Sequence, residues 1–110
     1  MQVNDLSDRA GEAESFLKAL ANKHRLMILC ELHKGERSVG QLLDSVDLSQ
    51  SALSQHLARL RDDGLVSTRR ASQMIYYSLA SADTERFIAL LYGMYCAPDC
   101  LKPKGKTDVD

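Results

Sequence analysis

The chemistry of this 110-residue chain is concentrated in one polar helix face and three cysteines. After position 49, Leu53, Leu57 and Leu60 recur at the i, i+4 and i+7 spacing of a single apolar stripe. Serine and glutamine are only moderate helix formers, so helix stability alone does not explain the opposite face. That face carries hydrogen-bonding groups and two cations: Gln50, Ser51, Ser54, Gln55, Arg59 and Arg61. A buried stripe behind such groups predicts a helix that reads bases in the major groove of DNA.

The residues before this helix predict three further helices that position it. Asn22, Ser38 and Ser49 are placed to cap the second, third and recognition helices. Gly35 and Gly64 can adopt the left-handed conformation that ends a helix. The expected ranges of the three helices are Ser7 to Leu20, Lys23 to His33 and Val39 to Val46.

The second half of the chain predicts a hairpin and a last helix. Two β-rich runs, residues 65–70 and 74–79, flank the short polar turn Ala71-Ser72-Gln73. Residues 82–96 repeat apolar side chains at helical spacing, and Pro98 ends the pattern. The order predicts a mainly α protein with a β-hairpin wing, which is a winged helix-turn-helix. We expect one domain over residues 1–98 and a disordered tail over 99–110.

The charge of the chain is distributed unevenly. The formal net charge is −1, yet residues 49–79 carry +2 and the remainder carries −3. This local excess favours contact with phosphate only mildly. No apolar run reaches transmembrane length and the N-terminus lacks the pattern of a signal peptide, so we expect a cytoplasmic protein without a membrane partner.

The chain has three cysteines, Cys30, Cys96 and Cys100. An odd number of thiols in a reducing compartment argues against static disulfides. Metal binding and redox chemistry both remain open. Cys30 or Cys96 alone is typical of a small buried residue. Together they place one thiol on a central helix and one at the end of the last helix, and this predicts a spatial pair. A direct disulfide needs Cα atoms about 4.4–6.8 Å apart, whereas a bridge with extra sulfur atoms spans more.

One long ordered string resembles the ArsR family of bacterial repressors. It runs from Leu48 to Arg70, continues at Ile75-Tyr76-Tyr77-Ser78-Leu79, and is preceded by the similar segment from Leu20 to Leu29. The likeness covers about residues 13 to 97. It implies a homodimer whose recognition helices enter successive major grooves of an inverted repeat in double-stranded DNA. The first and last helices would form the interface, with Phe16, Leu17, Phe87, Leu91, Tyr92 and Tyr95 as candidates.

The resemblance also implies where the DNA contacts lie. Ser51, Ser54, Gln55 and His56 would face the groove. Arg69, Arg70 and Gln73 would lie on the wing near phosphates. Arginine contacts to phosphate should make the affinity depend on salt, while serine and glutamine should specify bases. The full set expected to contact DNA is Gln50, Ser51, Ser54, Gln55, His56, Arg59, Arg69, Arg70 and Gln73.

The sensing sites of the family differ, and one type fits this chain. The Cys-x-Cys of the arsenite and lead sensors is replaced by Ser38-Val39-Gly40, and no histidine follows His56 to form the zinc and nickel site of the final helix. The persulfide-responsive repressors BigR and SqrR carry two cysteines where this chain has Cys30 and Cys96. In that subgroup oxidised sulfur species link the thiols through a short sulfur chain, and the repressor leaves DNA. The virulence regulator HlyU shares this framework.

Cys100 leaves more than one inducing signal possible. It is an inert thiol, a resolving thiol, or the third ligand, with Cys30 and Cys96, for a soft ion such as arsenite. Neither a Cys-x-x-Cys pair nor a Gly-rich loop is present, which argues against an enzyme with a cysteine nucleophile. An interaction module that has lost DNA binding is the remaining alternative. We predict a repressor without enzymatic activity or cofactor, induced by persulfide or a related sulfur species.

Overall fold

The structure, a computed structural model, describes the fold of residues 3–95 and the side chains of residues 7–95. Cys96, Cys100 and the predicted disordered tail therefore lie outside the described residues. In chain order the elements are α1 (Val3–Leu20), α2 (Lys23–His33), β1 (Arg37–Ser38), α3 (Val39–Ser45), α4 (Gln50–Asp62), β2 (Val66–Ala71), β3 (Met74–Leu79) and α5 (Ala82–Tyr95). This confirms the predicted winged helix-turn-helix architecture.

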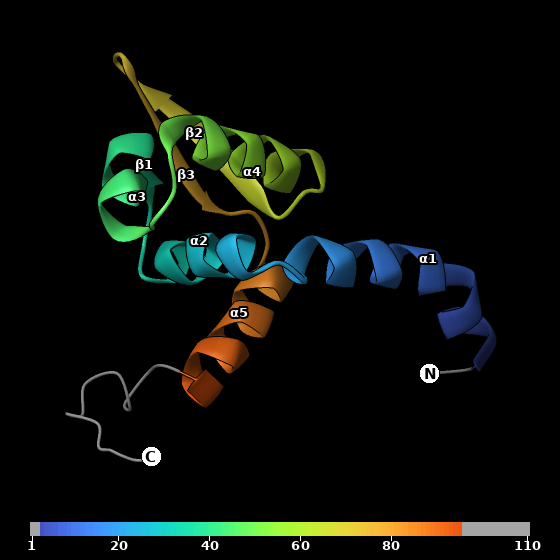
Figure 1. The fold of residues 1–110 in the computed structure, drawn as a ribbon. Helices are drawn as coiled ribbons and strands as arrows, with labels where there is room; N and C mark the ends of the chain where they lie inside the picture. Colours follow the sequence, from blue (N-terminus) through green and yellow to red (C-terminus); the bar gives the residue numbers. More distant parts are fainter. Residues whose placement is uncertain (1–2, 96–110) are drawn as a thin grey trace.

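The helices before the recognition helix begin and end largely as the caps predict. Asn22 has an extended backbone and its side chain accepts a hydrogen bond from the Arg25 amide, 3.0 Å away. Gly35 follows α2 with φ at 140°, where an L side chain is disfavoured. α1 begins at Val3, earlier than the predicted Ser7. Figure 1 shows α1 extending beyond α2 and away from the body of the molecule.

α3 and α4 form the helix-turn-helix. The Ser38 side chain and the Gln41 side chain bond each other's backbone amides, which makes a capping box at the start of α3. The Ser49 hydroxyl accepts from the Ala52 amide at 3.1 Å and caps α4. Gly64 follows α4 with φ at 78°, so the chain turns there into the wing.

The wing is a three-stranded antiparallel sheet in the order β1-β3-β2, where the sequence predicted only two strands. β1 has two residues and pairs Ser38 with Tyr76. So short a strand shows no alternation of apolar residues, which is why it was missed. β2 lies one residue later than predicted, and β3 agrees. The turn is made by Ser72 and Gln73, and Ser72 supplies the positive φ, 61°, that two-residue hairpin turns need.

α2 is the central helix, because it contacts α1, α3, α4, α5 and β3. Ile28 and Leu29 of α2 are fully buried, as are Leu53 and Leu60 of α4 and Ile88 of α5. α5 starts after Ser81, whose hydroxyl accepts from the Thr84 amide at 3.1 Å. Across the part of the chain that the structure describes, no helix is both long and apolar enough to span a bilayer.

Candidate nucleic-acid interface

α4 divides into the two faces that its sequence predicts. Leu53, Leu57 and Leu60 are at most 1% exposed and anchor the helix to the core. Gln50, Ser51, Ser54 and Gln55 are exposed. The four polar side chains are therefore held outward by a rigid, packed element, which is what reading base edges requires. Their contact with DNA stays a prediction.

His56 is placed differently from these four side chains. It is half-buried, and its ring lies 6.0 Å from that of His24 at the start of α2. Burial lowers the pKa of His56, and the nearby charges of Arg25 and His24 lower it further. A neutral imidazole packed against α2 sits at the edge of the exposed face, so its predicted base contact would be peripheral.

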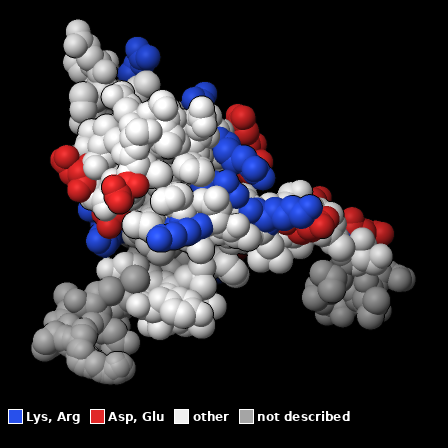
Figure 2. Space-filling view, viewed as in Figure 1, with Lys and Arg blue, Asp and Glu red and all other residues white. Residues whose placement is uncertain are grey.

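The two cations of α4 lie in its last turn. Arg59 pairs with Asp63, whose carboxylate is 3.2 Å from its Nε, and both side chains are at least one-third exposed. Exposed pairs of this kind contribute little stability, so Arg59 remains available to a phosphate. Arg61 is exposed. Figure 2 shows blue atoms gathered where α1, α2 and α4 meet and again beside the wing, with red atoms between them.

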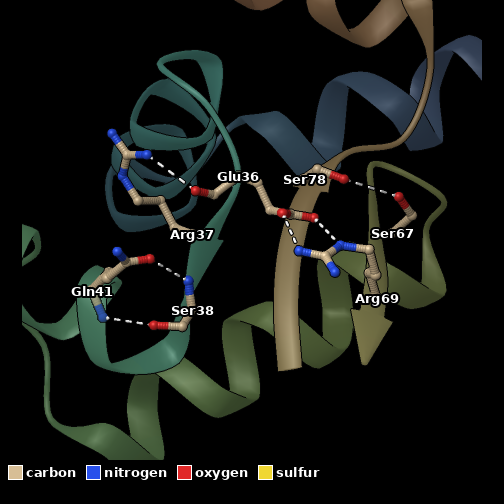
Figure 3. A network of polar contacts seen from close by, with 7 residues as sticks. All are labelled: Glu36, Arg37, Ser38, Gln41, Ser67, Arg69 and Ser78. Carbon is tan, nitrogen blue, oxygen red and sulfur yellow. Dashed lines mark hydrogen bonds and ion pairs between the residues drawn. The ribbon is translucent and has the colours of Figure 1, made fainter. Parts of the chain in front are cut away.

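The wing holds the other predicted contacts. Arg70 and Gln73 are exposed near the hairpin turn. Arg69 is not a free cation, because its Nη2 and Nε donate to the two carboxylate oxygens of Glu36 at 2.7 and 3.0 Å (Figure 3). Its guanidinium also lies over the Tyr76 ring, 4.9 Å from the centroid. A phosphate that takes this fork of Nε and Nη2 on Arg69 would replace Glu36.

Two residues of this region were missed in the sequence. Glu36 lies 33 positions from Arg69, and no local spacing connects them. Arg25 is only 8% exposed and donates to backbone carbonyls at the end of α1. A signal for Arg25 did exist, since it occupies the helical stripe of Ile28, Leu29 and Leu32, where a charge is unusual.

Cys30 is the one free cysteine among the described residues. It is half-buried on α2 and packs against the core. Burial raises the pKa of its thiol, Glu31 raises it further, and Lys34 opposes them. The His33 ring lies 5.1 Å from the Tyr92 ring of α5. Within the described range no three His, Cys, Asp or Glu side chains come together to hold a metal ion.

A helix-turn-helix with an exposed polar recognition face and a β wing defines a winged helix-turn-helix DNA-binding protein. Residues 22–68 match the family described as "Bacterial regulatory protein, arsR family". Transcriptional activator HlyU from Vibrio cholerae is 48% identical over 96 residues, which cover 87% of this chain and 89% of that protein. The chain belongs to the ArsR family of transcriptional regulators, which are not enzymes, and this confirms the resemblance.

Solved structures agree with this assignment. The reduced form of HlyU from Vibrio cholerae superposes with a TM-score of 0.80 at 48% identity, covering 86% of this chain and 99% of that one. The transcriptional repressor BigR from Xylella fastidiosa gives 0.77 at 40% identity, covering 88% and 99%. The homodimeric winged helix-turn-helix domain of Mb0332 from Mycobacterium bovis gives 0.73 at 30% identity, covering 96% and 95%.

Proposed function

We propose that this chain is a cytoplasmic, homodimeric repressor that binds an inverted-repeat operator in duplex DNA. We further propose that it loses operator affinity when sulfur atoms join Cys30 to Cys96. The exposed polar face of α4 and the likeness to HlyU and the repressor BigR support the DNA-binding part. The contact between His33 and Tyr92 carries the sensing part.

This contact joins α2, which carries Cys30, to α5, which precedes Cys96 in the sequence. His33 lies three residues after Cys30, and Tyr92 lies four residues before Cys96. Each cysteine is therefore only three or four residues along the sequence from the contact. α2 and α5 are also packed against each other. This proximity supports a bridge formed after a modest rearrangement at the end of α5.

The raised pKa of Cys30 favours Cys96 as the first nucleophile. Because its pKa is raised, Cys30 is a protonated thiol near neutral pH, and the thiolate is the attacking species. We therefore expect Cys96 to attack the outer sulfur of a first persulfide, forming Cys96 persulfide and releasing a thiol. The sulfur of Cys30 then bonds to the outer sulfur of the Cys96 persulfide, which releases two electrons and two protons. A second persulfide takes up these electrons and protons and is reduced to a thiol and hydrogen sulfide. The product is a trisulfide, with one sulfur atom between the two cysteine sulfurs.

Exposed apolar side chains support the homodimer. Leu17 of α1 is 53% exposed, and Leu90 and Met94 of α5 are 59% and 55% exposed. A largely open, apolar surface runs along α1 and includes Ala13 and Leu17. Phe16 and Phe87 pack edge to face within the chain, with ring centroids 5.6 Å apart, and this contact joins the end of α1 to α5. A second copy that covers these surfaces would remove them from water.

Mass spectrometry combined with operator titration tests the sensing part. The operator is first selected from a randomised duplex pool. We expect persulfide to add the mass of sulfur between Cys30 and Cys96 and to lower operator affinity about 5- to 150-fold, a coupling of about 1–3 kcal/mol. Cys30→Ser and Cys30→Ala should bind DNA normally and ignore persulfide. A normal persulfide response in both variants would refute the switch.

The same experiment separates the soft-ion alternative. Cys100→Ser should retain the persulfide response if Cys30 and Cys96 act as a pair. If arsenite lowers operator affinity and Cys100→Ser abolishes that effect, the three cysteines act as ion ligands instead.

A further inference from the structure

The bidentate ion pair of Glu36 and Arg69 spans the whole wing sheet. Glu36 directly precedes β1, and Arg69 lies in β2, on the other side of β3. The sheet register places Ser38, Tyr76 and Arg69 side by side across the three strands. The Arg69 guanidinium lies over the Tyr76 ring, 4.9 Å from its centroid. It also reaches the Glu36 carboxylate (Figure 3). The guanidinium is thus held on one face of the sheet by a stacked ring and a carboxylate.

This face is the solvent side of the wing. Side chains alternate along a strand, so Val66 of β2, which is 3% exposed, points to the opposite face from Arg69. The side chain of Arg69 is 57% exposed and that of Glu36 is 35% exposed. Exposed ion pairs are weak, so this one can be exchanged for another partner at little cost.

Glu36 presents to Arg69 the same pattern that a DNA phosphate would. Two oxygens accept two parallel hydrogen bonds from one guanidinium, and arginine forms this fork with carboxylate and phosphate alike. The hydrogen bonds from Arg69 lower the pKa of Glu36, so the carboxylate stays charged at neutral pH. Arg69 is therefore preorganised for an anion and already neutralised by one.

We propose that Glu36 occupies the phosphate site of Arg69 in the free protein, and that a DNA phosphate replaces it when the wing meets the duplex. Arg69 changes partners rather than gaining one. Glu36 consequently weakens binding to every duplex, because each complex must first break the internal pair. This role concerns phosphate contact alone and does not depend on the cysteines.

Binding to a mixed-sequence duplex of about 30 base pairs tests the exchange, since such binding depends mainly on phosphate contacts. Glu36→Gln should tighten binding about two- to fivefold per subunit, the range expected from losing an exposed ion pair. Arg69→Gln should weaken binding and reduce the slope of log affinity against log salt by about 0.9 per subunit. In the Arg69→Gln background, Glu36→Gln should keep only the general effect of removing one negative charge, no larger than that of a matched exposed carboxylate.

Two controls separate the exchange from a general effect of charge. Asp62→Asn makes the same change in charge at an exposed carboxylate of α4, and its effect should persist in the Arg69→Gln background. Glu36→Asp keeps the charge but shortens the side chain, so it should tighten binding less than Glu36→Gln. Melting curves check that each variant is folded.

Two outcomes would overturn the exchange. One is an Arg69→Gln variant with the wild-type salt slope, which means that Arg69 stays with Glu36 on DNA. The other is a Glu36→Gln effect of undiminished size in the Arg69→Gln background.

Discussion

The guanidinium of Arg25 caps the end of α1 by donating to the carbonyl oxygen of Ala19 at 2.6 Å and to that of Lys18 at 3.1 Å. A cation at the C-terminus of a helix complements the helix dipole and satisfies carbonyls that lack partners. Burial lowers the pKa of Arg25, and the like charge of Arg59 on α4 adds to this effect. Arg25 therefore stands where α1, α2 and the recognition helix meet.

Replacement of Arg25 should destabilise this junction. Arg25→Met keeps much of the side-chain volume but removes the guanidinium donor from the Ala19 carbonyl, while the Lys18 carbonyl still accepts from the Ala21 amide at 3.2 Å. The free energy of unfolding should therefore fall by about 1–3 kcal/mol. Urea denaturation at neutral pH measures this. Lys23→Met, at an exposed position of the same helix, should change the free energy by less than about 0.5 kcal/mol. Equal effects of the two substitutions would contradict a capping role for Arg25.

His56 should make stability depend on pH. Its folded-state pKa is lowered from the ordinary 6.5, so below that value the unfolded chain binds more protons than the folded one. The contribution of neutral His56 to the free energy of unfolding is fully present above pH 6.5. It is lost as the pH falls from 6.5 through the lowered pKa. Urea denaturation at pH 7.5 and 5.5 should therefore show a smaller loss for His56→Gln than for the wild type. Identical losses would show that His56 is not responsible.

Cys30 should react slowly as a nucleophile. Its pKa is raised above the ordinary 9.0 by burial and by Glu31, so little thiolate is present at neutral pH. In a Cys96→Ser/Cys100→Ser variant, iodoacetamide should modify Cys30 more slowly at pH 7 than it modifies free cysteine, and the rate should rise above pH 9. Mass spectrometry follows the modification. A rate at pH 7 matching that of free cysteine would remove the basis for Cys96 attacking first.

The homodimer should depend on the apolar side chains of α5. Leu90→Glu would place two carboxylates in the proposed interface, at a cost on the order of several kcal/mol. Sedimentation equilibrium at micromolar concentration should then show a monomer. Met74→Glu is the matched control, because Met74 is also an exposed apolar residue but lies on the wing. A Leu90→Glu variant that remains dimeric would place the interface elsewhere.

Base reading and phosphate contact should be separable by substitution. Gln55→Ala should lower affinity for the selected operator by about 1–3 kcal/mol and leave mixed-sequence duplex binding nearly unchanged, because a glutamine recognises bases. Arg70→Gln should weaken both and reduce the salt slope by about 0.9 per subunit. Fluorescence anisotropy at several salt concentrations measures these effects. If Gln55→Ala weakens both duplexes alike, the exposed face of α4 does not read sequence.

The helices of this protein follow from its sequence because their signals are local. Asn22, Ser38 and Ser49 each accept from an amide three residues ahead, so a cap can be read without knowing the rest of the fold. The apolar stripe of α4 likewise specified which face would be buried and which would stay polar. Residue types and spacing were therefore sufficient for the helix-turn-helix and for the family resemblance.

Only the tertiary structure decided which charge meets which partner. Arg69 was expected on the wing near phosphates, and its pairing with Glu36 appears only when β1 joins the sheet beside β3. Arg25 reaches Ala19 because α1 and α2 meet at an angle set by packing. Such contacts join residues on different elements, and their distances depend on how the elements pack. Local periodicity carries no information about that arrangement.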